Sequence, residues 1–380
     1  MAKLGDIATY INGYAFKPQD WSDEGIPIIR IQDLTGNSYQ ANRYNGEYAS
    51  KYEVNDGDVL ISWSASLGVY IWHGEKAVLN QHIFKVVFDK ERISKDFFIH
   101  QVGLILENAA FDAHGATMKH LTKPVFDALP FYLPPYEKQC EIAEVLDKVT
   151  SLISLRKQQL AKLDELVKAR FVEMFGDPIN NPMKWIISKI EDITAQEKNA
   201  LKAGPFGSAL KKEFYVRSGY KIYGQEQVIC GDASFGDYYI DEEKYKELKN
   251  CAVQAGDILI SLVGTYGKTL IMPDNYEAGI INPRLMKITL NKNKVTPIYF
   301  KYYFESNALK ASMDANTHGG TMGILNLGII RQMKIQVPPL SLQNQFAAFV
   351  ERVDQQKQTV QQSLEKLELM KKALMQEYFG

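Results

Sequence analysis

The most constraining feature of this chain is a long apolar stripe between residues 134 and 178. Its apolar residues recur at steps of three and four, which is typical of one face of a long helix. Arg156 is the one polar residue in this register. The stripe comprises Ile142, Leu146, Val149, Ile153, Leu160, Leu163 and Val167. A helix of this extent is about 50–60 Å long at roughly 1.5 Å per residue, which is more than a small domain can cover.

The same stripe recurs at the end of the chain, in residues 338–380. Both stripes follow a double proline, Pro134-Pro135 and Pro338-Pro339, and both have a glutamine four residues later, Gln139 and Gln343. The prolines permit a helix to begin after them, and Gly176 ends the first helix. The second stripe comprises Phe346, Val350, Val353, Val360, Leu364, Leu367 and Leu374.

An apolar stripe with this spacing and length is typical of a coiled-coil seam. Two such stripes in one chain can bury each other, so we expect the two helices to pair. The alternative is two separate amphipathic helices, each packed on its own domain.

The rest of the chain contains an internal repeat of two similar units. Residues 54–62 (VNDGDVLIS) return as residues 253–261 (VQAGDILIS), and residues 79–82 (LNQH) return as residues 281–284 (INPR). Residues 114–118 (HGATM) return as residues 318–322 (HGGTM). An internal repeat of this kind predicts two domains of one architecture.

Each repeat mixes strands and helices. Short β-like runs are expected at residues 26–31, 59–63 and 84–88, and apolar periodicity predicts helices over residues 95–110 and 297–313. Gly57-Asp58 and Gly256-Asp257 are interpreted as turns before buried strands. The predicted fold class is α+β: two similar mixed globules separated by two long helices that pair as an antiparallel coiled coil.

Composition places the chain among soluble globular proteins. The three cysteines, Cys140, Cys230 and Cys251, are scattered, which argues against a disulfide framework and a structural zinc site. The N-terminus lacks a signal peptide and no apolar run is long enough to span a membrane. We therefore expect a cytoplasmic protein.

The charge balance does not favour tight nucleic-acid binding by this chain alone. The net charge is −1, whereas DNA-binding domains are usually basic. Residues 1–136 hold 12 Lys and Arg against 16 Asp and Glu, and residues 185–335 hold 19 against 16. If the chain reads DNA, partner subunits are expected to supply much of the phosphate contact.

The sequence contains no complete catalytic motif. Leu133-Pro134-Pro135-Tyr136 resembles the N/D-P-P-Y/F signature of amino-methyltransferases, but leucine cannot accept a hydrogen bond from the target amine. The segment at residues 264–269 (GTYGKT) lacks the first glycine of a phosphate-binding loop, because that position is Leu262. The six histidines form no ligand cluster. We predict no catalytic residue, no metal and no cofactor.

Candidate binding residues lie in loops whose frame recurs in both halves while their side chains differ. Arg, Lys, Asn and Gln read base edges by paired hydrogen bonds, and small polar loops can approach a phosphate backbone. For any single residue, a plain loop role is the simpler interpretation. The candidates in the first half are Tyr14, Phe16, Lys17, Arg30, Gln32, Ser62, Ser66, Asn80, Gln81 and His82. Those in the second half are Ser208, Lys211, Tyr223, Gln225, Thr265, Lys268, Asn282 and Arg284.

Two globules of this size, each followed by a long helix that opens at P-P-x-x-x-Q, resemble the specificity subunit of type I restriction–modification systems. The G-D-V/I-L-I-S and H-G-x-T-M segments, present in both halves, belong to the same resemblance. It implies two target recognition domains, residues 1–133 and 179–337, each reading half of a split, asymmetric site in double-stranded DNA. The helices at residues 134–178 and 338–380 would be the spacer between them.

The resemblance also implies partners in host defence and DNA methylation. Two modification subunits, which are adenine methyltransferases, would dock on the helices, and restriction subunits with motor and nuclease activity would join them. The chain itself would be non-catalytic. Two other hypotheses stay open at this point: a scaffold whose loops bind protein partners, and an enzyme with an unrecognised site.

Overall fold

The computed structural model describes residues 1–37, 42–112, 122–316 and 325–380. Those residues form two compact units, and each unit includes parts of both long helices. Unit 1 comprises residues 1–157 and 361–380, and unit 2 comprises residues 158–360. The repeated HGATM and HGGTM segments, with His114, His120 and His318, lie outside the described residues.

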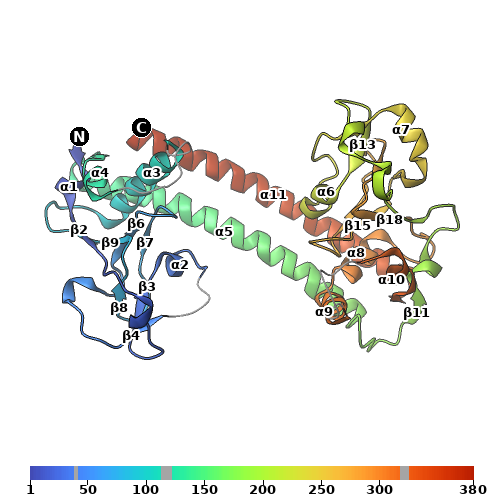
Figure 1. Ribbon diagram of the computed structural model, residues 1–380, viewed down its shortest axis with the longest axis horizontal. Coiled ribbons are helices and arrows are strands. Elements are labelled where there is room, and N and C mark those ends of the chain that lie inside the picture. Colours follow the sequence, from blue (N-terminus) through green and yellow to red (C-terminus); the bar gives the residue numbers. More distant parts are fainter. Residues whose placement is uncertain (38–41, 113–121, 317–324) are drawn as a thin grey trace. The chain divides into compact units, whose positions relative to one another are not determined.

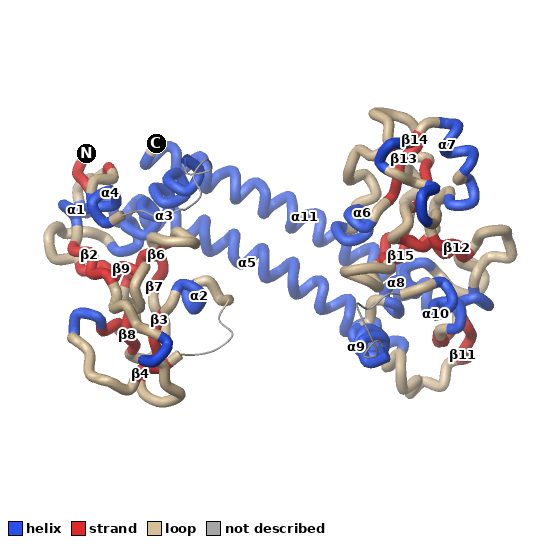
Figure 2. The backbone as a smooth tube through the Cα atoms, viewed as in Figure 1, coloured by secondary structure: helices blue, strands red, loops and turns tan. Residues whose placement is uncertain are grey.

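The elements of unit 1 precede the first long helix (Figures 1 and 2). Its strands are β1 (Ala2–Lys3), β2 (Thr9–Asn12), β3 (Ile26–Ile29), β4 (Arg43–Tyr44), β5 (Glu53–Val54), β6 (Val59–Ser62), β7 (Gly68–Ile71), β8 (Ala77–Leu79), β9 (Ile83–Val87) and β10 (Pro130–Phe131). Its helices are α1 (Leu4–Ile7), α2 (Ile31–Leu34), α3 (Lys95–Asp112) and α4 (Lys123–Asp127), with short 3-10 turns η1 (Pro18–Asp20) and η2 (Ser50–Tyr52).

Unit 2 is built from a corresponding set of elements. Its strands are β11 (Ile186–Lys189), β12 (Leu201–Ala203), β13 (Tyr220–Tyr223), β14 (Tyr239–Ile240), β15 (Ile258–Ser261), β16 (Thr269–Ile271), β17 (Gly279–Ile281), β18 (Leu285–Ile288) and β19 (Lys334–Val337). Its helices are α6 (Gln225–Cys230), α7 (Glu242–Glu247), α8 (Pro297–Phe304), α9 (Asn307–Asn316) and α10 (Leu327–Gln332). Its 3-10 turns are η3 (Ile190–Ile193), η4 (Gly207–Ala209), η5 (Lys212–Phe214) and η6 (Lys249–Cys251).

The sheets of the two units have the same strand order. Among the described residues, unit 1 has an antiparallel sheet β2-β9-β6-β7 and unit 2 has β12-β18-β15-β16. A second sheet is β4-β3-β8-β5 in unit 1 and β14-β13-β17 in unit 2, where an isolated bridge from Ala252 to Ile280 takes the place of β5. Each of these sheets contains one parallel pair, β3–β8 or β13–β17. The internal repeat read from the sequence is therefore a repeat of topology.

Most predicted elements form close to where the sequence placed them. The three β-like runs are β3, β6 and β9, and Gly57 and Gly256 take the positive φ that a turn requires, +84° and +80°. The helix predicted over residues 297–313 is interrupted, which corrects that prediction. The first helix, α8, ends at Phe304, and Ser306 starts α9, because its hydroxyl accepts a hydrogen bond from the Leu309 amide (3.3 Å).

The long helices are α5 (Tyr136–Phe175) and α11 (Leu340–Phe379). Each begins directly after its double proline, and α5 ends at Gly176, whose φ is +80°. In each unit, the segments of α5 and α11 that belong to it lie side by side (Figure 1). All fourteen residues of the two predicted stripes are buried or half-buried.

Contacts within each unit show that the helix segments run antiparallel. In unit 2, Lys357 forms an ion pair with Asp164 (2.6 Å), and the ring of Phe346 lies 5.4 Å from that of Phe171. As the residue number in α5 rises, the number of its partner in α11 falls, so the two helices run in opposite directions. In unit 1, Ile142 and Leu146 share a core with Leu374 and Phe379 near the end of the chain.

Arg156, the polar residue in the apolar register, is accommodated by a polar partner. Its Nε donates to the hydroxyl of Ser363 on α11 at 3.3 Å, and the neighbouring Lys157 pairs with Glu368 at 3.0 Å. Both contacts lie within unit 1. A guanidinium at the seam is tolerated because it is hydrogen-bonded and keeps its head close to water.

The glutamine of each P-P-x-x-x-Q segment joins the helix start to its globule. Gln343 is fully buried, and its amide nitrogen donates to Pro338 O (2.8 Å) and Lys294 O (3.0 Å). Its amide oxygen accepts from the Thr296 amide (2.8 Å), just before α8. Gln139 repeats this arrangement with Pro134 O (2.9 Å) and the Ser94 amide (2.9 Å), just before α3.

We expect Gln343→Leu to lower the free energy of unfolding by about 2–4 kcal/mol. The leucine fills a similar volume but leaves two carbonyls and one amide buried without partners. The matched control is Gln355→Leu, at an exposed position of the same helix. Urea unfolding of both purified variants measures the difference. Equal midpoints for the two variants would show that Gln343 does not hold the helix start.

Candidate nucleic-acid interface

Three loop segments of unit 1 converge on a fourth, which is the turn that connects β8 to β9. The amide of Asn80 donates to Ile29 O (3.1 Å), and the amide of Gln81 donates to Tyr14 O (2.8 Å). His82 completes the turn, and its carbonyl accepts from the Trp63 amide (3.2 Å). The segments at residues 12–17, 29–34 and 62–68 are thus all bonded to the segment at residues 79–83.

The same four segments meet in unit 2. The amide of Asn282 donates to Tyr223 O (2.8 Å), and the amide of Leu262 donates to Arg284 O (2.9 Å). Gly204 donates to Leu285 O at 2.9 Å. The segments at residues 204–212, 223–227 and 262–268 therefore gather around the segment at residues 282–285.

Glycine permits the closest of these approaches. A Cβ atom at Gly13 would collide with the carbonyl oxygen of Asn80, and a Cβ at Gly204 would collide with that of Asn282. The two glycines occupy equivalent places in the repeat. A side chain at either position would push the first segment away from the turn.

The loop after β6 and its equivalent after β15 are built by a buried serine. The Ser62 hydroxyl donates to Ser66 O, and the Ser261 hydroxyl donates to Thr265 O, four residues on in each case. Ala65 and Gly264 take the same left-handed conformation, with φ of +59° and +69°. The strand β16, rather than a helix, follows Lys268.

Three of the predicted binding residues are buried, so we withdraw them from the candidate interface. Phe16 packs in a small core with Ile28 and Val78, and Ser62 is fully enclosed. Tyr223 is also fully buried and donates its hydroxyl to Glu277 O (2.6 Å). A side chain with little or no exposed surface cannot reach a base edge. These three side chains therefore contribute to packing and internal hydrogen bonds.

Other predicted residues are engaged in holding the loops. The Arg30 guanidinium lies over the Trp21 ring at 5.5 Å, and its nitrogens lie 2.6–3.1 Å from the amide oxygen of Asn42. The side chain of Gln225 donates to Val263 O. Lys211 forms an ion pair with Glu213 at 3.4 Å.

The predicted asparagines and histidine also shape the turn itself. The side-chain oxygens of Asn80 and Asn282 accept from the amides of Gln81 and Arg284, each at 2.9 Å. His82 takes a positive φ of +73°, and its ring meets that of Trp63 edge to face. For these residues the plain loop role is the one that the structure displays.

The remaining candidates have side chains that are exposed or half-exposed at the converging loops. The Tyr14 ring packs edge to face against Phe16 and Tyr52. The other side chains form no hydrogen bond or ion pair with a described residue. They are Lys17, Gln32, Ser66 and Gln81 in unit 1 and Ser208, Thr265, Lys268 and Arg284 in unit 2.

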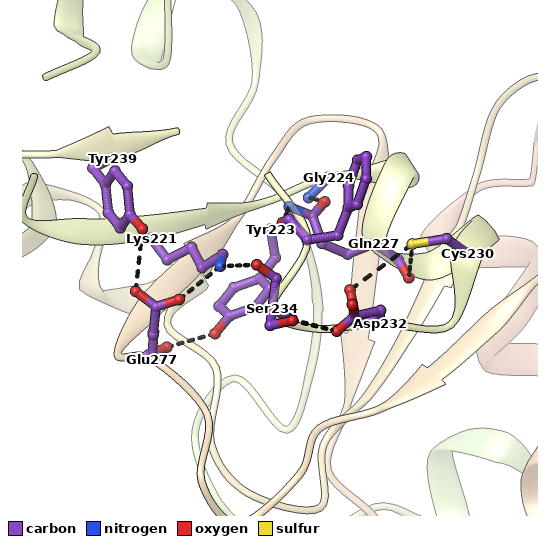
Figure 3. Close-up of polar contacts among 10 residues, drawn as sticks. Lys221, Tyr223, Gly224, Gln227, Cys230, Asp232, Ser234, Tyr239 and Glu277 are labelled. Atoms are coloured by element: carbon purple, nitrogen blue, oxygen red, sulfur yellow. Dashed lines mark hydrogen bonds and ion pairs between the residues drawn. The ribbon is translucent and has the colours of Figure 1, made fainter. Parts of the chain in front are cut away.

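A polar cluster that sequence reasoning missed fixes one of the unit 2 segments (Figure 3). The ammonium of Lys221, only 1% exposed, donates to Glu277 Oε1 (2.7 Å) and Ser234 O (2.8 Å). Tyr223 and Tyr239 donate to Glu277 O (2.6 Å) and Glu277 Oε2 (3.3 Å). Burial raises the pKa of the Tyr223 phenol, which therefore stays protonated, and a hydrogen-bond donor, well into the alkaline range. The cluster fixes β13 directly before the segment at residues 223–227.

One ion pair recurs in both units, at the end of β6 and β15 that lies away from the converging loops. Asp257 follows the Gly256 turn, and its carboxylate pairs with Lys287 of β18 at 3.1 Å. Asp58 pairs with Lys85 of β9 in the same way at 2.9 Å. Asp257 is completely buried, whereas the side chain of Asp58 is 27% exposed.

Nothing among the described residues forms a metal centre. No group of three or more His, Cys, Asp or Glu side chains could hold a metal ion there. No helix in that part of the chain is long and apolar enough to cross a membrane.

Comparison with known proteins decides the family. The sequence profile described as "Type I restriction modification DNA specificity domain" matches residues 1–165 and 182–369. The chain belongs to this family of type I restriction–modification specificity proteins. The two matches correspond to the two copies of the repeat.

Curated relatives carry the same description at low identity. The chain is 22% identical to the specificity subunit of the type I restriction enzyme EcoBI from Escherichia coli, over 92% of this chain and 78% of the relative. It is 21% identical to the MjaVIII specificity subunit from Methanocaldococcus jannaschii, over 99% and 90%. Both alignments extend through both units.

Solved structures of specificity proteins share the fold. One, from a study of complex assembly and conformational transition in a type I R-M system, has a TM-score of 0.62 at 14% identity. It covers 100% of this chain and 96% of its own. The S subunit from M. genitalium has a TM-score of 0.51 at 14% identity, over 100% and 95%.

We expect Lys287→Met to destabilise unit 2 by about 3–5 kcal/mol, because it leaves the carboxylate of Asp257 buried and without its cation. The internal repeat supplies the control. Lys85→Met removes the equivalent lysine, but water reaches Asp58 and the expected loss is about 1 kcal/mol. Thermal unfolding of the two variants compares them. A loss as large for Lys85→Met as for Lys287→Met would contradict the role assigned to burial.

Proposed function

We propose that this specificity protein directs a type I restriction–modification complex to a split, asymmetric site in double-stranded DNA. Each unit would read one half-site through its four converging loops. The observation that carries the proposal is the repeated backbone frame around Asn80 and Asn282, which presents different side chains in the two units. Two frames of one shape with different tips suit two different base sequences.

The residue ranges predicted from the sequence separate the parts that would read DNA from the parts that would space them. Residues 1–133 and 179–337 would be the target recognition domains, and residues 134–178 and 338–380 the spacer helices. The paired contacts of α5 and α11 within each unit support a stiff connection. A stiff spacer would fix the separation of the half-sites, as it does for dimeric DNA readers.

Partner subunits would complete the activity. We propose two adenine methyltransferase subunits and restriction subunits with motor and nuclease functions, with this chain as the non-catalytic reader in the cytoplasm. The net charge of −1 supports a division in which partners supply much of the phosphate contact. A scaffold that binds only proteins is not favoured, because the family description is that of a DNA specificity domain.

Footprinting tests the proposal as a whole. The chain together with its methyltransferase subunits should protect two short segments of a duplex that are separated by an unread gap. Methylation sequencing of the host, with and without this gene, identifies the motif. A methylation pattern that does not depend on the gene, or a single continuous footprint, would reject it.

We expect Arg284→Ala and Lys268→Ala to act differently on binding. Arg284 is exposed on the central turn of unit 2, so its loss should cost about 1–3 kcal/mol and relax specificity at one base pair. Lys268 lies on the small polar loop, so its loss should weaken binding on all sequences and reduce the salt slope by about one. Binding titrations of the complex at several salt concentrations, on the target and on singly altered duplexes, separate these outcomes. The assignments are reversed if Lys268→Ala is the variant that relaxes one position.

We expect a longer spacer to change the gap and nothing else. The variant carries four extra residues after Gln158 in α5 and four after Val360 in α11. Four residues are close to one helical turn, so the apolar faces stay nearly in phase while each helix grows by about 6 Å. The gap in the methylated motif should grow by one or two base pairs, at 3.4 Å each, with both half-sites unchanged. An unchanged gap would show that these helices do not set the separation.

A further inference from the structure

Phe206 is an aromatic side chain of unit 2 that is exposed to solvent. It is 85% exposed, although it belongs to a segment that converges on the Asn282 turn. Its ring meets no other ring among the described residues. Removing a phenylalanine ring from water lowers the free energy, so a ring in this position can stabilise a complex with a flat, apolar partner surface.

The segment that carries Phe206 is anchored at both ends. Gly204 is bonded to Leu285 O and fits closely against Asn282, and Pro205 is buried. At the other end, Leu210 belongs to a hydrophobic core. Between them, the Phe206 carbonyl accepts from the Ala209 amide (3.3 Å), which closes the short turn η4. The exposed ring therefore stands on a fixed base.

The corresponding segment of unit 1 has no such ring. Gly13 corresponds to Gly204, and Lys17 corresponds to Lys211, because each lysine precedes a 3-10 turn. Three residues lie between Gly13 and Lys17 in unit 1, and six lie between Gly204 and Lys211 in unit 2. In the shorter segment of unit 1, Tyr14 is 46% exposed, but its ring contacts Phe16 edge to face at 4.9 Å. No aromatic side chain of that segment is as exposed as Phe206.

The surroundings of Phe206 are basic. The segments at residues 204–212, 262–268 and 282–285 contain four cationic side chains, Lys211, Lys212, Lys268 and Arg284, of which Lys211 is paired with the adjacent Glu213. The fourth converging segment adds one acid, Glu226. An apolar ring among cations fits a nucleic acid, whose phosphates are anionic and whose bases are flat and apolar on their faces.

We propose that Phe206 inserts between two base pairs of the half-site read by unit 2 and unstacks them. Apolar side chains act as wedges of this kind in other DNA-binding proteins, where the unstacked step bends the duplex toward further contacts. The step would contribute specificity without hydrogen bonds, because pyrimidine–purine steps unstack most easily. The inference rests on the DNA-binding function proposed above.

The test uses the complex of the full chain with its methyltransferase subunits and a duplex that contains the methylated motif. The fluorescent base analogue 2-aminopurine is placed in turn at each position of both half-sites except the methylated adenines and their neighbours, because methyltransferases flip their target base out of the stack. Wild-type protein should raise its fluorescence at one step of the unit 2 half-site. Phe206→Ala should abolish that signal and weaken binding by roughly 5- to 150-fold, the range expected for the loss of one stacked base.

Two further variants distinguish a wedge from a general effect. Phe206→Tyr retains the ring and should retain the signal. Ile186→Ala truncates another highly exposed apolar side chain of unit 2, on β11, and should leave binding and fluorescence unchanged. Subunit assembly is measured for every variant by size-exclusion chromatography.

The outcomes separate failure of the wedge from failure of the proposed function. If wild-type protein shows no sequence-specific binding, DNA recognition itself is rejected. If it binds specifically but no position responds, or if Phe206→Ala responds like wild type, only the wedge is rejected. If Phe206→Ala loses methyltransferase subunits, the ring contacts a protein partner, which also overturns the inference.

Discussion

The core of each unit is completed by a helix from a distant part of the chain. In unit 1, α5 residues such as Ile142 and Leu146 bury their side chains together with Leu374 and Phe379, near the end of the chain. In unit 2, Phe171 and Phe175 of α5 form one aromatic cluster with Phe346 of α11. Each core therefore depends on both helices, and removing residues 340–379 would expose apolar surface in both units.

The four segments of the repeated loop frame are joined to one another mainly by backbone groups. Amides and carbonyls join the four segments, and the side-chain oxygens of Asn80 and Asn282 close the central turns. Backbone hydrogen bonds are insensitive to the identity of the neighbouring side chains. Exposed tips such as Gln32 or Thr265 can therefore vary without loss of the frame, which suits a protein whose sequence preference must differ from copy to copy.

The sequence predicted the architecture well because the strongest signals were periodic or repeated. The seam residues and the turns at Gly57 and Gly256 follow from local rules of helix periodicity and backbone conformation. The break of the predicted helix at Ser306 was missed because an apolar pattern on both sides concealed an N-cap. Secondary structure was therefore predicted best where one local rule acted without competition.

The candidate site was predicted less well, for a physical reason. Residue type gives the chemistry of a side chain but not its burial. Phe16 and Tyr223 are buried, and Arg30 is engaged by Trp21 and Asn42, although each has the chemistry of a DNA contact. Phe206 was not among the candidate binding residues, because the exposure that distinguishes it has no sequence signal.

The buried glutamines connect the loop frame to the helices. In unit 2, Gln343 joins the first turn of α11 to the segment before α8, and the Glu305 carboxylate at the end of α8 accepts from the amide and hydroxyl of Thr269, each at 2.7 Å. Thr269 begins β16, directly after the loop that carries Lys268. A path of short hydrogen bonds and one helix thus leads from the start of α11 to a proposed phosphate contact. Within the unit, these hydrogen bonds and the packing of α8 tie the orientation of this loop to the first turn of α11.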